Sequence, residues 1–267
     1  MSPLTQLISA RWPEVVTFLL ILARTSGMTA SAPFWGGKMA PPLVRVIVTV
    51  GLSAAIYPLV TMPAAVTTVP SGLALLLVLA GEILVGLLLG WSAQLLFVGM
   101  RCAGQQVEIK MGIGLAQLID PNEGGQTSFF AILLDLIAVL VFLTVNGHHL
   151  LVRALVASYQ VFPVADRIVI LRLVQGLVLS SGMLFTIALQ VSAPIIVALL
   201  LSDLMLAVVA RAIPHFNVFL VAPPLQLAFG MLVLLLALPA LVSFCSNYVA
   251  TLGFQLSALT VISGSGK

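Results

Sequence analysis

Apolar residues run in long blocks along the chain, and short polar stretches rich in glycine and proline separate the blocks. Six blocks approach or exceed the roughly 20 residues with which a helix crosses a bilayer. Backbone polar groups in lipid must be satisfied within their own segment, so helix is the expected state. The pattern predicts an all-α integral membrane protein with about six long hydrophobic helices arranged as hairpins, near residues 14–32, 43–62, 71–99, 127–146, 176–209 and 218–250.

Two features of these blocks do not fit a protein of six plain spans. Blocks 71–99 and 176–209 would reach roughly 44 and 50 Å as helices, whereas the hydrocarbon core is about 30 Å thick. Six spans would also place five Lys or Arg residues on each side, although such residues normally gather on one side. We therefore expect the helices to bury against partner subunits, partly raised out of the bilayer plane.

The composition excludes several classes of protein. Of the 267 residues 61% are hydrophobic and only 7% are charged, whereas a soluble domain carries about 25% charged residues. The net charge of +3 comes without a cluster of Lys and Arg, which argues against nucleic acid as a partner. Membrane lipid is the expected surrounding. Cys102 and Cys245 are expected to be free apolar residues rather than a disulfide.

The chain shows no recognisable catalytic or metal-binding motif. His148 and His149 are adjacent and point to different faces of a helix, and they lack further ligands at a workable spacing. Nucleophile elbows, phosphate-binding loops and dinucleotide fingerprints do not occur. We expect neither an enzyme, nor a cofactor, nor a metal site.

Four charged residues interrupt the apolar blocks: Arg24, Glu82, Asp135 and Asp203. A charge in lipid costs at least a few kcal/mol, so each should face protein or a water-filled cavity. One interpretation is a proton or ion pathway. The other is structural pairing, such as Arg24 with Glu82 or Asp203 with Arg211. A proton-coupled carrier more often groups its carboxylates at one depth, so pairing is preferred.

Glycines mark two further stretches. Gly86 and Gly90 form a G-x-x-x-G pair, which permits close helix approach. Residues 100–126 form a polar, glycine-rich connection that nevertheless keeps large apolar side chains. Such side chains can close a pore by packing and by excluding water. This connection is therefore either an ordinary loop between two spans or a gate.

Several blocks of the sequence resemble the FliR family of flagellar export-gate proteins and their virulence counterparts in type III secretion. The matching order and spacing cover nearly the whole chain. The matching pieces are GEILVGLLLGW at 81–91, GQQVEIKMGIGLAQLIDPNEGGQ at 104–126, NGHHLLVRALVASYQVFP at 146–163, and the block 188–227 with its ARAIPHFNVF motif at 210–219.

The resemblance implies a single membrane domain over residues 1–267, with N-terminal helices at 1–99, a glycine-rich plug loop at 100–126 and C-terminal helices at 127–267. It implies a non-enzymatic subunit of the flagellar export gate in the bacterial inner membrane, within the flagellar basal body. FliP-like and FliQ-like subunits, and other membrane proteins of the export apparatus, are the implied partners. Unfolded export substrates would pass a plug that includes Gln105, Gln106, Met111, Gly112, Ile113, Gly114 and Leu115.

Two other functions stay open. The first is a role in the virulence branch of the same family. The flagellar branch is preferred to it mainly on the DPNEGG and NGHH blocks. An autonomous transporter of small molecules or ions would instead show inverted repeats and grouped intramembrane charges.

Overall fold

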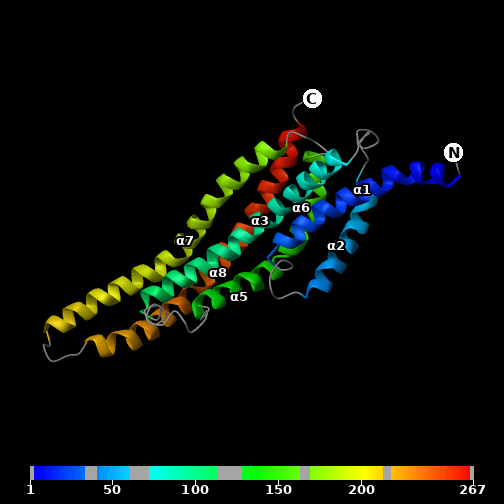
Figure 1. Cartoon of the computed structure of the whole chain (residues 1–267). Helices are drawn as coiled ribbons and strands as arrows, with labels where there is room; N and C mark the ends of the chain where they lie inside the picture. The colour runs from blue at the N-terminus through cyan, green and yellow to red at the C-terminus, as the bar shows by residue number, and fades with distance from the viewer. Residues whose placement is uncertain are drawn as a thin grey trace. The chain divides into compact units, whose positions relative to one another are not determined.

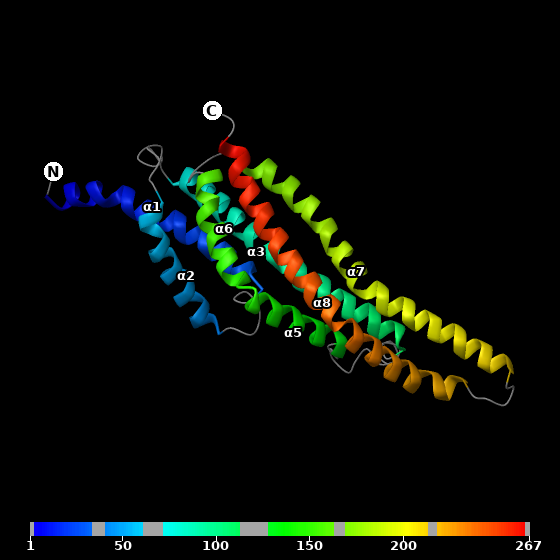
Figure 2. The same ribbon diagram turned by 180° about the vertical axis from the view of Figure 1, so that it is seen from behind.

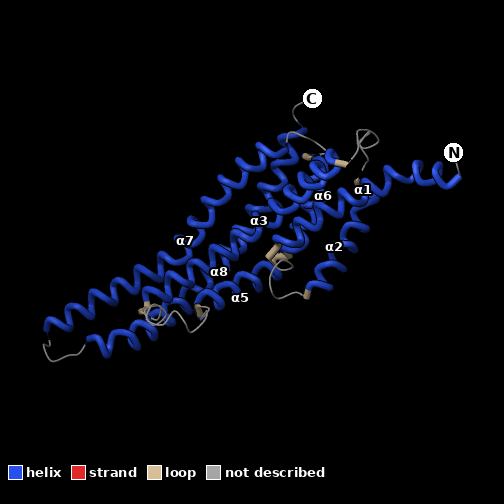
Figure 3. Tube along the Cα trace, in the orientation of Figure 1, coloured by secondary structure: helices blue, strands red, loops and turns tan. Residues whose placement is uncertain are grey.

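The computed structural model of the chain describes residues 3–33, 41–60, 72–112, 128–162, 169–212 and 218–264 (Figure 1). Within these ranges the backbone is helical apart from short turns and contains no strand (Figure 3). The predicted all-α class is confirmed. The helices are α1 (Pro3–Ser31), α2 (Pro42–Ile56), the short 3₁₀ helix η1 (Tyr57–Leu59), α3 (Leu73–Lys110), α5 (Phe129–Thr144), α6 (Gly147–Val161), α7 (Val169–Ala212) and α8 (Val218–Gly264).

The number of helices fit to cross a membrane is lower than the predicted six. In the described part of the chain, four helical segments are long and apolar enough, and α5 with α6 would add a fifth, broken span. Helix α1 is not among them, because polar residues such as Thr17, Arg24 and Thr25 dilute its apolar run. The break between α5 and α6 falls at Asn146, whose φ of 57° lies in the left-handed region that asparagine tolerates.

The chain forms two compact units. The first comprises residues 1–94, 146–180 and 249–267, and the second comprises residues 95–145 and 181–248. Helices α3, α7 and α8 each contribute one part to either unit. Neither unit is one continuous stretch of sequence, so the two units do not divide the chain into successive domains. The single domain over residues 1–267 stays a prediction.

In the first unit, α1 and α3 approach each other backbone to backbone. A Cβ atom placed on Gly86 would lie 2.8 Å from Met28 N, and one on Gly90 would lie 2.6 Å from Met28 O. On the facing helix, a Cβ atom on Gly27 would lie 2.9 Å from Leu87 N. The close approach predicted from the G-x-x-x-G pair is confirmed, and α1 is the partner helix.

Helix α2 packs beside α1 in the same unit, as the two opposite views show (Figures 1 and 2). The hydroxyls of Thr29 and Thr49 form a hydrogen bond of 2.8 Å. The rings of Phe18 and Tyr57 meet edge to face with centroids 6.2 Å apart. Polar pairing and aromatic packing thus hold α2 and η1 to the N-terminal helix.

In the second unit, the last part of α3 lies against α5 and α7. A Cβ atom on Gly104 would lie 2.5 Å from Ala131 N, and one on Gly99 would lie 2.6 Å from the Ile187 side chain. Small residues again allow close approach. The buried apolar side chains of this unit come from all of its helices and include Leu96, Met100, Val107, Leu134, Ala138, Val191, Ile195, Leu199, Leu234 and Leu241.

Candidate functional site

Helix α3 continues to Lys110, so residues 100–110 are helical rather than part of a loop. The predicted start of the plug loop at residue 100 is wrong by eleven residues. Gly104 is one of the glycines of this polar stretch, yet it lies inside α3, where it admits the backbone of α5. Helix α3 closes with hydrogen bonds from Met111 N to Val107 O (3.0 Å) and from Gly112 N to Ile109 O (3.1 Å).

Gly112 ends the helix in a left-handed conformation with φ of +79°. Such a conformation at a helix C-terminus favours glycine, because a side chain would be strained there. The preceding Met111 is fully buried. Its Sδ would lie 3.1 Å from a Cβ atom placed on Gly230 of α8, so this side chain fills the space that the glycine leaves.

A buried carboxylate ties the end of α3 to the start of α5. Glu108 is only 4% exposed. Its Oε2 accepts a hydrogen bond from the Ser128 hydroxyl and one of 3.3 Å from the backbone N of Phe130. Ser128 is the N-cap of α5, and its Oγ accepts from Ala131 N at 3.2 Å. Glu108, which precedes segment 113–127, therefore bonds directly to the residues that follow this segment.

A second carboxylate ties the end of α3 to α7 and α8. Lys110 Nζ lies 3.1 Å from Asp203 Oδ2 of α7, and Gln226 of α8 donates to Oδ1 of the same carboxylate. Both charged side chains are about one-third exposed, at 33% and 32%. Lys110 also carries positive charge in the last turn of α3, where the helix dipole favours it.

The remaining predicted plug residues lie in different settings. Gln105 and Gln106 are exposed on α3, and Gln106 Oε1 accepts a hydrogen bond of 3.0 Å from Ser192 of α7. Met111 and Gly112 form the turn described above. The predictions for Ile113, Gly114 and Leu115 lie outside the described residues.

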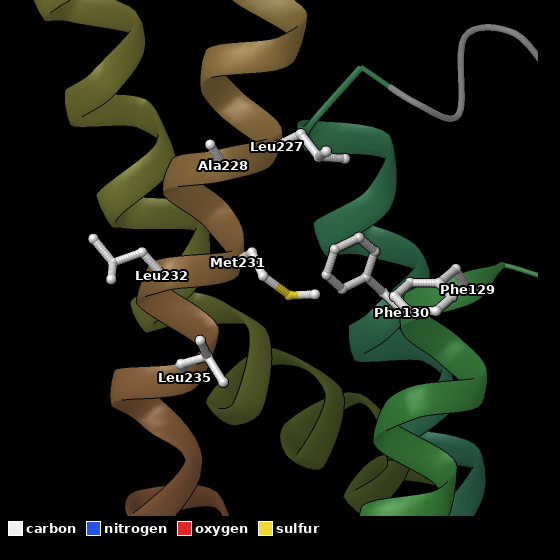
Figure 4. A pocket seen from close by; sticks show the side chains of 7 residues that line it. All are labelled: Phe129, Phe130, Leu227, Ala228, Met231, Leu232 and Leu235. Carbon is white, nitrogen blue, oxygen red and sulfur yellow. The ribbon is translucent and has the colours of Figure 1, made fainter.

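An apolar groove of about 560 Å³ opens beside this polar cluster, between the start of α5 and the middle of α8. In Figure 4 the Met231 side chain points toward the Phe130 ring across the groove. The groove adds no chemically reactive group to the site. Its lining residues are Phe129, Phe130, Leu227, Ala228, Met231, Leu232 and Leu235.

Arg24 of α1 is a buried charge of the first unit that bonds to residues from two other parts of the chain. Its guanidinium is 1% exposed and donates to Glu82 Oε2 at 2.6 Å. It also donates to Ser158 Oγ at 3.1 Å and to Phe162 O at 3.0 Å, and it lies 4.2 Å from the ring centroid of Tyr159. Helix α1 is thereby joined to α3 and α6 by a hydrogen-bonded buried ion pair.

Of the other predicted charges, Asp135 and Asp203 each have an ion-pair partner, and only the partner of Asp203 differs from the one expected. Arg101 Nε lies 3.4 Å from Asp135 Oδ1 within the second unit. The pairing of Asp203 with Arg211 is wrong, since Asp203 pairs with Lys110. Eight residues on one helix span about 12 Å along its axis, which is too far for direct contact. Arg211 is exposed at the end of α7.

Comparison with known proteins shows which family this chain belongs to. The family described as "Bacterial export proteins, family 1" matches residues 15–252, which include every contact described above. This chain belongs to that family. With four helical segments long and apolar enough to cross a membrane in its described part, the chain is a multi-pass membrane protein of this family.

The relatives of this export protein are named as flagellar biosynthetic proteins or as a Yop proteins translocation protein. The flagellar biosynthetic protein FliR of Bacillus subtilis is 30% identical over 83% of this chain and 85% of its own length. FliR of Escherichia coli is 28% identical over 91% of this chain and 92% of its own. The Yop proteins translocation protein T of Yersinia pestis is 27% identical over 87% of this chain and 90% of its own.

Sequence reasoning about this export protein missed two functional candidates, Glu108 and Lys110. Both were counted as part of a polar loop. The signal that could have found Glu108 is its spacing of four residues from Gly104, which places the two on one helix face. The partner of Lys110, in contrast, depends on how α7 and α8 pack, and no sequence spacing shows that.

Proposed function

We propose that this chain is a subunit of the flagellar type III protein export gate, through which unfolded substrates cross the bacterial inner membrane within the flagellar basal body. The observation that carries the proposal is the match with flagellar FliR proteins over nearly the full length of both chains. The alternative is the export gate of a virulence type III secretion system, which the Yersinia match favours. The two differ in the proteins whose export is lost when the chain is deleted.

The chain works as part of an assembly with FliP-like and FliQ-like subunits, and it contributes packing surfaces rather than catalysis. Two observations support this proposal. Helices α3, α7 and α8 have 38, 44 and 47 residues, well above the roughly 20 that span a bilayer. Helix α7 also presents a run of exposed apolar side chains that a partner would cover: Leu201, Leu204, Met205 and Val208.

The end of α3 leads into the plug of the closed channel, which begins at the Met111–Gly112 turn. The buried Met111 side chain and the left-handed Gly112 mark where the regular helix stops. The apolar residues that follow in sequence, Ile113 and Leu115, exclude water in the resting state. Glutamines 105 and 106 on the exposed side of α3 give the channel wall its polar lining.

Deletion and complementation in the host of this protein test the function. We expect loss of motility and of flagellin in the culture supernatant, with flagellin still made in the cell, and recovery of both when the gene is restored. Normal flagellar secretion in the deletion strain would refute the flagellar proposal. A specific loss of virulence-type secretion would instead establish the alternative.

Two further experiments separate the assembly from the plug. Co-expression with the host's FliP-like and FliQ-like proteins, followed by native mass spectrometry, should give one stable complex; a chain that stays alone and transports a solute by itself would contradict it. Deleting Gly112–Ala116 should leave that complex intact but let small ions leak through the membrane. A tight membrane in this variant would show that the connection is no plug.

A further inference from the structure

The first turn of α5 receives its hydrogen-bond acceptors from two sources. The leading N–H groups of a helix have no partner inside the helix. Ser128, as the N-cap, accepts from Ala131 N at 3.2 Å. Phe130 N donates to Glu108 Oε2 at 3.3 Å, and Glu108 belongs to α3. The start of α5 is thus capped by its own N-cap and also by a carboxylate of another helix.

The electrostatics of this contact favour a charged acceptor. The N-terminus of a helix carries partial positive charge, so a carboxylate is stabilised there. Hydrogen bonds to a charged acceptor are stronger than those between neutral groups. Because Glu108 is almost fully buried, loss of its carboxylate would leave buried donors on α5 unsatisfied.

The neighbouring turn of α3 is shaped for the same contact. Gly104 precedes Glu108 by one helical turn and therefore lies on the same face. A Cβ atom on Gly104 would lie 2.5 Å from Ala131 N, so only glycine lets the backbone of α5 come this close. One residue of this face removes bulk, and the next supplies the acceptor.

We propose that Glu108 is a positioning residue that fixes the first turn of α5 to the end of α3. Through this contact Glu108 fixes the distance between Gly112 and Ser128. Gly112 is the last described residue before segment 113–127, and Ser128 is the first described residue after it. The consequence for export rests on the proposed function.

Amide hydrogen exchange of the purified full chain in its native complex tests the contact itself. In Glu108→Leu, the amide of Phe130 should exchange about tenfold faster or more, as expected when a hydrogen bond to a charged group is lost. Glu108→Gln should restore most of the protection, because its amide oxygen can accept from the Ser128 hydroxyl and from Phe130 N. Glu14→Leu, at an exposed carboxylate on α1, is the matched control.

The pattern along the chain distinguishes positioning from general stability. Faster exchange confined to the start of α5, with α1 and α2 unchanged, supports the proposal. Unchanged exchange at Phe130, or equal acceleration in all helices, overturns it. If Glu108→Leu does not accumulate, Ser128→Ala provides the second measurement, since it leaves Glu108 bound to Phe130 N but should expose the Ala131 amide. In that variant Glu108 should keep the Phe130 amide protected, so faster exchange of Phe130 together with Ala131 overturns the proposal.

Flagellin secretion in the same strains tests the consequence. We expect several-fold lower export from Glu108→Leu at equal complex yield, and near-normal export from Glu108→Gln. Normal export in Glu108→Leu, despite faster exchange at α5, overturns the role of this contact in export. If the deletion strain exports flagellin like its parent, the proposed function fails, whereas the exchange result still decides whether Glu108 positions α5.

Discussion

The substitution Gly86→Ala should separate α1 from α3, although it adds only one methyl group. The new Cβ would lie 2.8 Å from Met28 N and even closer to the carbonyl oxygen of Arg24. Both are backbone atoms inside a helix, so neither can rotate away. Because the contact with the Arg24 carbonyl oxygen is the shortest, reaching an ordinary contact of about 3.5–4 Å requires the helices to move apart by about 2 Å. That movement would also loosen the contacts at Gly27 and Gly90.

A matched control allows the magnitude to be worked out. Overpacking of a tight contact costs about 1–3 kcal/mol, whereas replacing glycine by alanine inside a helix gains up to about 1 kcal/mol. A Cβ atom on Gly81, in the same helix, meets no other described atom within 4 Å. Gly81→Ala therefore keeps the gain without the clash. Since the gain is common to both variants, they should differ by the cost of overpacking, about 1–3 kcal/mol in the free energy of unfolding.

The assay is the thermal midpoint of the detergent-solubilised complex, followed by size-exclusion chromatography after heating. For a chain of this size, 1 kcal/mol shifts the midpoint by about 2–4 °C. Gly86→Ala should thus lose its native peak about 2–12 °C below Gly81→Ala. Equal midpoints for the two variants would refute the backbone-to-backbone packing of α1 on α3.

Three further predictions concern the charged and strained positions. Arg24→Leu should destabilise the chain by about 3–5 kcal/mol, because it leaves the buried Glu82 uncompensated. Adding Glu82→Leu should recover much of the complex yield. A double variant as unstable as the single one would count against this pair. Lys110→Asp and Asp203→Lys should each cost at most about 1 kcal/mol, as partly exposed pairs do, and their combination should restore the midpoint, whereas additive losses would show that they do not interact. Gly112→Val should lower flagellin secretion at normal complex yield, because a β-branched residue is strained at φ of +79°; unchanged secretion would show that this conformation is not needed.

Much of the helical architecture could be predicted from the sequence, because the apolar blocks and their breaks are local signals. The close contact of α3 through Gly86 and Gly90 followed from residue spacing alone. The end of α3 could not be predicted in this way, because a polar, glycine-rich stretch is typical of a loop. Here its first part continues the helix, and Gly104 allows α5 to pack closely. That distinction depends on α5, whose position no local pattern reports.

The candidate site shows the same limit for side chains. The pair Arg24–Glu82 could be proposed because both interrupt apolar blocks. Lys110 and Glu108 lie in a polar stretch typical of a solvated loop, and only the spacing of Glu108 from Gly104 indicates a shared helix face. Their partners Asp203 and Ser128 come from other helices, and only the packing of the second unit brings them together.

Site-specific photo-crosslinking to a stalled substrate tests the central claim most directly. A flagellar export substrate fused to a tightly folded domain should stop inside the gate. A photo-reactive residue at Gln105, exposed near the end of α3, should then crosslink to the stalled substrate, whereas one at the exposed Val46 of α2 should not. Absence of a crosslink from Gln105, or equal crosslinking from both positions, would contradict a substrate path along the end of α3.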